Sequence, residues 1–137
     1  MSLLRFGLNF LLLCSLFLGN RLSAQVVDNF SDGNFSANPT WAGDVDQFII
    51  SPELELQSDG DTTSATNREI YLSTANEAMN STQWEFFVNP KVSTSSNNRI
   101  DFYLSSDLAE LTGANTGYFV RIGGTPDEVA LFRKDGL

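Results

Sequence analysis

Four segments in the later part of the chain alternate apolar and polar side chains with a period of two residues. They are residues 82–88 (TQWEFFV), 99–104 (RIDFYL), 118–122 (YFVRI) and 128–133 (EVALFR). Successive side chains of a β-strand point to opposite faces, so this period predicts strands. No segment beyond residue 24 has the helical period of about 3.6 residues, and the chain is therefore predicted to be all-β.

Three shorter strands are predicted at residues 47–51, 53–57 and 69–73, separated by Pro52 and by polar loops. Several predicted strands carry an aromatic residue on the second face, which indicates a sheet covered on one side and partly covered on the other. The predicted fold is an antiparallel β-sandwich or concanavalin-like jelly roll. The chain stops at an Asp135-Gly136 pair, which is typical of the start of a hairpin turn. The sandwich is therefore expected to be incomplete at its C-terminus, with an exposed apolar edge near Phe132.

Residues 1–24 have the three-part plan of a secretory signal peptide, with cleavage predicted between Ala24 and Gln25. A membrane anchor is the alternative, but the apolar run is about a dozen residues long, against the ~20 that a spanning helix needs. We therefore expect a protein that is secreted or held at the outer cell surface, with no transmembrane segment after cleavage. Residues 25–137 are expected to form one β-sandwich domain, the N-terminal part of a longer one.

Residues 25–137 contain no His and no Cys. A Ser-His-Asp triad, a Cys nucleophile and a zinc site of the usual His/Cys kind are therefore excluded. Removal of residues 1–24 takes away two arginines and no acid, so the formal charge changes from −9 to −11. Such an acidic chain is not expected to bind nucleic acid, because phosphate binding needs a basic patch. It is compatible with calcium, with neutral ligands such as glycans, or with solubility alone.

Four aspartates near the predicted mature N-terminus, Asp28, Asp32, Asp44 and Asp46, are candidate calcium ligands. Calcium takes 6–8 oxygen ligands, which carboxylates and backbone carbonyls supply. The alternative is turn formation, because Asp beside Gly favours turns, and the spacing is not that of an EF-hand loop. Calcium is the only cofactor that the sequence suggests.

Exposed aromatic side chains are the other candidate binding groups, because a flat ring can cover the apolar face of a sugar. Trp41 lies in a Pro- and Gly-rich segment and is predicted to be exposed, whereas Trp84 is predicted to be in the core. Tyr103 and Tyr118 are further candidates, and their positions in the alternating strands place them on opposite faces of the sheet.

Glu53 and Glu55 are two residues apart in a predicted strand, a spacing that the carboxylate separation of a glycosidase does not exclude. They lack a third acid and an aromatic platform on the same strand, so a solvated strand face is the preferred interpretation. No catalytic residue is predicted, and the chain itself is not expected to be an enzyme, whatever domains follow it in a longer protein.

The stretch GYFVRIGG (residues 117–124) combines a central arginine with two closing glycines. A phosphate-binding loop needs a helix after the glycines, and here another predicted strand follows, so the glycines are predicted to form a turn. Arg121 alternates with Val120 and Ile122, which predicts a position on one strand face. There it is expected to pair with an acid across the sheet, Asp101 or Glu85.

Two long stretches, residues 29–50 and 84–124, resemble the N-terminal region of large secreted Bacteroidetes proteins, which often carry lamin-tail and C-terminal sorting domains further along. The shared pattern is D-x-F-S-D-G-x-F with N-P-x-W, then W-E-F, Y-L-x-S-D and G-Y-x-V-R-I-G-G. The resemblance implies a concanavalin-like β-sandwich with more strands than this chain contains. It implies no particular activity.

These observations predict a secreted non-catalytic β-sandwich module that recognises glycans or the cell-envelope surface. The alternative is a purely structural N-terminal cap or spacer for downstream domains. A fragment of a secreted hydrolase is a third possibility, which the lack of a catalytic pattern disfavours.

Overall fold

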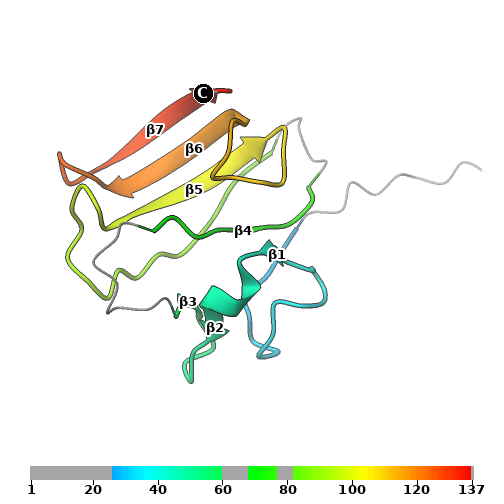
Figure 1. Cartoon of the computed structure of the whole chain (residues 1–137). Coiled ribbons are helices and arrows are strands. Elements are labelled where there is room, and N and C mark those ends of the chain that lie inside the picture. Colours follow the sequence, from blue (N-terminus) through cyan, green and yellow to red (C-terminus); the bar gives the residue numbers. More distant parts are fainter. Residues whose placement is uncertain (1–25, 60–67, 77–81, 137) are drawn as a thin grey trace, which may run out of the picture.

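The computed structural model describes residues 26–59, 68–76 and 82–136, and these parts of the chain are all-β (Figure 1). In chain order the strands are β1 (Ala42–Gly43), β2 (Phe48–Ile50), β3 (Leu56–Ser58), β4 (Leu72–Ser73), β5 (Arg99–Ser106), β6 (Thr116–Gly123) and β7 (Glu128–Asp135). One short 3₁₀ helix, Val45–Gln47, is the only helix in these residues. The predicted fold class is therefore confirmed at the level of all-β.

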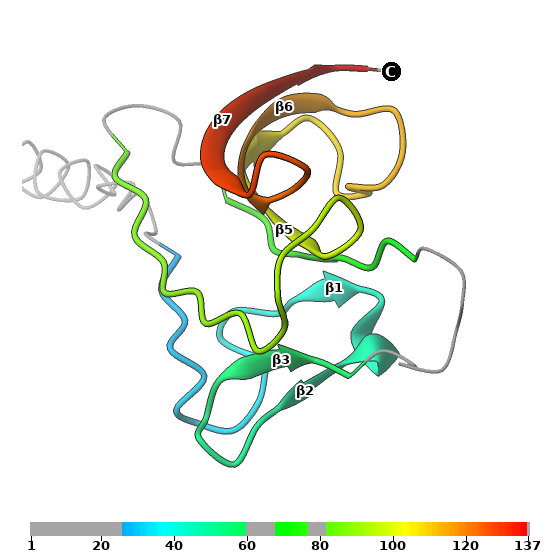
Figure 2. The same cartoon turned by 90° about the vertical axis from the view of Figure 1, so that its left-hand side faces the viewer.

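The main sheet is antiparallel, has the order β5-β6-β7 and is strongly curved (Figure 2). Its three strands are the predicted strands 99–104, 118–122 and 128–133, each extended by a few residues. A tight turn joins β6 to β7, with the Asp127 N–H donating to the Gly124 carbonyl over 3.1 Å. Gly123 and Gly124 have φ of 95° and 89°, a region that favours glycine. The predicted turn role of the two glycines is confirmed.

Two ladders of two strands each lie below the main sheet in the view of Figure 1. β1 pairs with β4, and β2 pairs with β3, both antiparallel. β4 runs between the main sheet and the β2–β3 hairpin (Figure 1). The early strands are shorter than predicted, and β3 begins only at Leu56 because residues 52–54 form the turn of the hairpin. Leu54 has φ of 63° in this turn and is 45% exposed.

The two faces of the main sheet differ in character, as the register shows. We call one the arginine face; it carries Arg99, Asp101, Tyr103, Phe119, Arg121, Phe132 and Lys134. We call the other the aliphatic face; it carries Ile100, Phe102, Tyr118, Val120, Ile122, Val129, Leu131 and Arg133. Loop residues 107–115 contact the arginine face, and residue Phe86 stacks on the aliphatic face.

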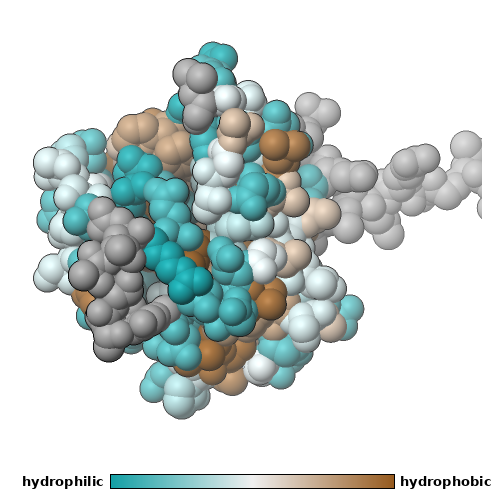
Figure 3. Space-filling view, in the orientation of Figure 1, coloured by the Kyte–Doolittle hydropathy of each residue, from teal (hydrophilic) through white to brown (hydrophobic). Residues whose placement is uncertain are grey.

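The buried core is small. Phe119 is the only hydrophobic side chain that is buried among the described residues, at 7% exposure. Its ring lies between those of Tyr103 and Phe132, with centroid distances of 5.0 and 5.3 Å. Many other apolar side chains reach the surface, and Figure 3 shows hydrophobic groups interspersed with hydrophilic ones on the face turned to the viewer.

Residues 82–88 do not form the predicted strand, since no ladder of backbone hydrogen bonds includes them. Their alternation still directs Phe86 toward the sheet, where its ring stacks on Phe102 with centroids 3.9 Å apart. Phe87 points the other way and is 80% exposed, and Trp84, predicted to be in the core, is 39% exposed. Side-chain stacking therefore places Phe86 on the sheet although its segment belongs to no strand ladder.

The predicted signal peptide and its cleavage site, Ala24-Gln25, lie outside the described residues. Within residues 26–59, 68–76 and 82–136, no helix is long and apolar enough to cross a membrane.

Candidate functional site

The N-terminal aspartates bond to nearby protein groups. Asp28 accepts hydrogen bonds from the Phe30 backbone N–H over 2.9 Å and from Trp41 Nε1 over 2.8 Å. Asp44 accepts from the Tyr71 backbone N–H over 3.0 Å, close to where β1 and β4 pair. Asp28 therefore holds the N-terminal segment against Trp41, and Asp44 fastens β4 to β1.

The other two aspartates act locally. Asp32 accepts from the Asn34 N–H over 3.1 Å, and Asp46 accepts from the Gln47 side chain over 3.2 Å. In the part of the chain that the structure describes, no three His, Cys, Asp or Glu side chains are grouped so that they could hold a metal ion. Calcium binding by these four aspartates stays a prediction. In the structure their carboxylates accept hydrogen bonds from neighbouring residues and, for Asp28 and Asp44, from distant segments.

Trp41 is half-buried rather than exposed, which corrects the expectation from its Pro- and Gly-rich surroundings. Its ring packs against Phe30 with centroids 6.2 Å apart, and its N–H is satisfied by Asp28. A ring that is packed on one side and hydrogen-bonded at its edge is a poor platform for a sugar. Trp84, which is 39% exposed, is the more accessible of the two tryptophans.

Arg121 is paired with Asp101 across β5 and β6, as the sequence predicts. Arg121 Nε donates to Asp101 Oδ1 and Nη2 to Oδ2, both over 2.7 Å. The hydrogen bond to Asp101 is the main cause of the raised pKa of Arg121. The guanidinium also lies 5.3 and 5.0 Å from the ring centroids of Phe119 and Phe132. Arg121 thus closes the stacked aromatic cluster.

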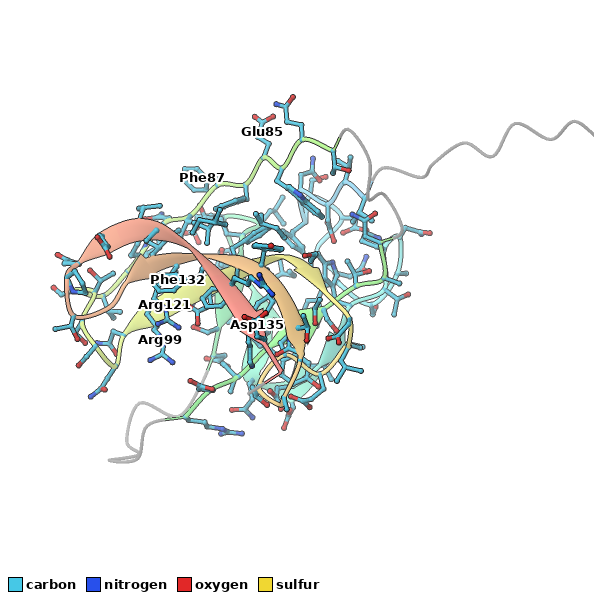
Figure 4. The ribbon with its side chains drawn as sticks, turned by 90° about the horizontal axis from the view of Figure 1, so that it is seen from above. Glu85, Phe87, Arg99, Arg121, Phe132 and Asp135 are labelled. Carbon is cyan, nitrogen blue, oxygen red and sulfur yellow. The ribbon has the colours of Figure 1, made fainter. Side chains whose placement is uncertain are left out.

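Asp101 also serves a second arginine. Arg99 lies 3.6 Å from Asp101 and donates to Glu69 over 2.5 Å, which connects the main sheet to the segment before β4. Figure 4 shows Arg99 and Arg121 on one side of the strands and Phe87 on the other. Each guanidinium on the arginine face forms an ion pair with a carboxylate of the same chain. The charges of this cluster therefore connect segments of the fold to one another.

Tyr103 is half-buried and also contributes to structure. Its ring stacks on Phe119, and its hydroxyl donates to the Leu111 carbonyl over 3.3 Å. Lys134 Nζ donates to the same carbonyl over 3.2 Å and to the Gly113 carbonyl over 2.6 Å. Tyr103 and Lys134 therefore hold loop residues 107–115 against the arginine face, and little of the Tyr103 ring is left for a ligand.

Glu53 and Glu55 do not share a strand face. Glu53 lies in the exposed turn of the β2–β3 hairpin, and Glu55 precedes β3 and pairs with Lys91 over 3.8 Å. The expected strand 53–57 begins only at Leu56, because the Ser51 hydroxyl accepts the N–H groups of both glutamates and stabilises the turn.

A second set of hydrogen bonds joins Tyr71, the residue before β4, to loop residues 107–115. The Tyr71 hydroxyl donates to Glu110 over 2.9 Å, and Glu110 also accepts from the hydroxyl and the N–H of Thr112. The bonds from Thr112, followed by that from Tyr71, lower the pKa of Glu110. The bond to Glu110, with burial and the charges of Glu110 and Asp44, raises the pKa of Tyr71.

These shifts predict a pH dependence with two limits. The contribution of Glu110 to stability should be present above its ordinary pKa and lost as the pH falls through the lowered value. The contribution of Tyr71 should be present below its ordinary pKa and lost as the pH rises through the raised value. An absorbance titration of tyrosinate in the protein and in Tyr71→Phe isolates Tyr71 by difference. Ionisation of Tyr71 at or below the ordinary pKa of tyrosine would contradict this assignment.

Tyr118 is the one aromatic candidate that stays accessible. It is 46% exposed and lies on the aliphatic face, opposite to the face of Tyr103, as predicted from the alternation. Its neighbours across the sheet are Ser105 on β5 and Arg133 on β7. Arg133 Nε donates to Asp135 Oδ1 over 2.6 Å. Thr116 is paired with Asp135 one step along the same face.

We call this group the Tyr118 site: Ser105, Thr116, Tyr118, Arg133 and Asp135. It combines one exposed ring with hydroxyl, guanidinium and carboxylate groups, which can donate and accept hydrogen bonds around the ring. Sequence reasoning found Tyr118 but missed the four polar residues. The strand register brings them together, and a shift between Tyr103 and Ser105 places Ser105 rather than Leu104 opposite Tyr118.

Comparisons with protein-family models, with curated proteins and with solved structures gave no match to this chain.

Proposed function

We propose that this chain is a non-catalytic binding module of a secreted or cell-surface protein, and that it takes neutral glycans at the Tyr118 site. The observation that carries the proposal is an exposed tyrosine ring among polar side chains on three adjacent strands. A flat ring covers the apolar face of a sugar, and hydroxyl and charged groups at its edge can bond to sugar hydroxyls. Groups placed on strands are held more rigidly than groups placed on loops.

The acidic composition fits a neutral ligand better than an anionic one, because the formal charge is −9 before any signal cleavage. The arginines on the arginine face are matched by Asp101 and Glu69, and Arg133 in the Tyr118 site is matched by Asp135. A polyanionic ligand would have to displace one of these carboxylates. Neutral sugar hydroxyls can instead bond to the pair as it stands.

The finer fold that we propose is the antiparallel β-sandwich or concanavalin-like jelly roll, as in the N-terminal region of the secreted Bacteroidetes proteins that the sequence resembles. Partial cover on both faces of the main sheet supports this proposal. Loop residues 107–115 are bonded to the arginine face, and Phe86 is stacked on the aliphatic face. Secretion through residues 1–24 is part of the same proposal.

The Tyr118 site is tested by glycan-array binding followed by titration of the best glycan. Tyr118→Ala is expected to weaken binding at least about tenfold, which corresponds to ~1.4 kcal/mol, because the stacking surface is lost. Tyr118→Phe keeps the ring and should bind nearly as well. Phe87→Ala, which removes an 80% exposed ring away from the site, is the matched control. Unchanged affinity in Tyr118→Ala would rule out this site.

A structural cap or spacer is the second candidate function. It is favoured by three aspartates that bond to other segments of the chain: Asp28 to Trp41, Asp44 to Tyr71, and Asp101 to Arg121. A stably folded chain that binds nothing across a broad glycan array would support the spacer role. It would also contradict the recognition role.

A further inference from the structure

β7 lies at one edge of the sheet, and its outer side pairs with no strand among the described residues. Its eight residues follow β6 without a shift in register. The Gly136 N–H donates to the Asn115 carbonyl over 3.1 Å, which continues the ladder by one step.

That bond also shows which backbone groups face outward. In an antiparallel ladder, residues alternate between bonding to the neighbouring strand and pointing away from it. Because Gly136 bonds toward β6, residues Lys134, Phe132 and Ala130 do so as well. The N–H and C=O groups of Arg133, Leu131 and Val129 therefore point out of the sheet and are available to another strand.

The centre of β7 lacks the devices that usually protect an edge strand. Natural edges carry a proline, a bulge, an inward charge or a covering loop. Residues 129–132 are Val-Ala-Leu-Phe, with no charge and no bulge. Val129 is 71% and Leu131 65% exposed. Charged residues occur at the two ends of the strand instead: Glu128 at one end, and Arg133, Lys134 and Asp135 at the other.

We infer that β7 pairs with β7 of a second copy of this chain, antiparallel and centred on Leu131, to form a six-stranded sheet across a two-fold axis. The charge pattern selects this register. Centring on Leu131 places Glu128 opposite Lys134 of the second copy, twice, and places Val129 opposite the stem of Arg133. Opposite charges across neighbouring strands stabilise a sheet, and an Arg stem can cover an aliphatic side chain.

The neighbouring registers match less well. Centring on Ala130 places Glu128 opposite Phe132, and centring on Phe132 places Ala130 opposite Lys134 and Val129 opposite Asp135. Lys134 remains able to serve Glu128, since an ammonium group has three N–H donors and two are used for the carbonyls of Leu111 and Gly113. A two-fold pairing uses the outer edge of β7 in both copies, so this contact is closed once two copies have met.

The first test is the mass of the full chain in solution, by light scattering and sedimentation over a wide concentration range. A dimer is expected. Leu131→Lys places two ammonium groups directly opposite each other and should raise the dimer dissociation constant at least about tenfold. Val92→Lys is the matched control, because Val92 is 66% exposed and lies outside the sheet. Circular dichroism of each variant verifies that the fold is kept.

The second test is cross-linking in a Cys14→Ser background, where the introduced cysteine is the only one. Leu131→Cys should form a disulfide-linked dimer on mild oxidation, because the two Cα atoms would be about 5.5 Å apart, a spacing that a disulfide spans. Val129→Cys should not, since its counterpart would be shifted by ~13 Å along the strands. Equal cross-linking of the two variants would overturn the register. A native chain that is monomeric at every concentration, with neither variant cross-linked, would overturn the dimer.

Discussion

Replacement of Phe119 with alanine is expected to lower the free energy of unfolding by about 3–5 kcal/mol, the range for truncating a buried aromatic side chain. Phe119 is the only buried hydrophobic side chain among the described residues and lies between the rings of Tyr103 and Phe132. Its removal also leaves the Arg121 guanidinium without one of its two ring contacts. Since small domains have net stabilities of about 5–15 kcal/mol, this loss is a large part of the total at the lower end of that range.

Urea denaturation followed by circular dichroism measures this loss. Phe87→Ala is the matched control, because it removes the same side chain from a position that is 80% exposed, and it should change the unfolding free energy by no more than about 0.5 kcal/mol. Similar destabilisation by the two variants would contradict the position of the core. A large effect of Phe119→Ala alone would support a core on the arginine face of the main sheet.

Gly117→Ala is expected to destabilise the β5–β6 pairing by about 1–3 kcal/mol or more, because an added methyl group has no room. A Cβ at Gly117 would lie 2.1 Å from the Ser105 carbonyl oxygen and 2.9 Å from the Ser105 carbonyl carbon. Both are backbone atoms, so the clash cannot be relieved by a side-chain rotation. The two strands would have to separate next to the register shift between Tyr103 and Ser105.

Urea denaturation measures the stability of Gly117→Ala, and amide hydrogen exchange reports where the ladder opens. Gly113→Ala is the control, since the nearest atom to its Cβ would be a side-chain atom, Glu110 Cγ, at the longer distance of 3.3 Å. Exchange should accelerate in β5 and β6 of Gly117→Ala. Equal midpoints for the two variants would show that β5 does not approach β6 as closely as described.

The polar residues of this chain divide into two groups with different consequences for function. Asp28, Asp44 and Asp101 are bonded to other parts of the chain, so replacing them should reduce stability before it affects binding. The residues of the Tyr118 site make fewer internal bonds and are therefore the positions where binding and stability can be separated. This division is what makes Tyr118→Ala a useful variant.

The strands of the main sheet could be predicted from sequence because apolar side chains recur every second residue in 99–104, 118–122 and 128–133. In an extended chain this spacing places them on one face, and the period is the same whichever face is covered more. The Arg121–Asp101 pair followed from the same period, since it places the two charges on matching faces of neighbouring strands. Cross-strand partners are then determined by the register.

Other expectations failed where alternation was not accompanied by backbone pairing. Residues 82–88 alternate because Phe86 stacks on Phe102, yet no strand pairs with them. In residues 53–57 the Ser51 hydroxyl binds two backbone N–H groups, and this bonding favours a turn over an extended chain. The exposure of Trp41 was misjudged because Asp28, thirteen positions away, satisfies its N–H.

The sequence by itself determined the all-β class, the three long strands, the glycine turn after β6 and the absence of His and Cys beyond residue 24, because these depend on local pattern and residue type. Only the tertiary structure decided which aromatic side chains are covered, which carboxylates are bonded within the chain, and which polar groups surround Tyr118. Those outcomes depend on contacts between segments far apart in the sequence, and a register shift near Leu104 that no local pattern encodes places Ser105 beside Tyr118. The outer side of β7, which has no partner strand among the described residues, likewise follows from the sheet order and not from the strand itself.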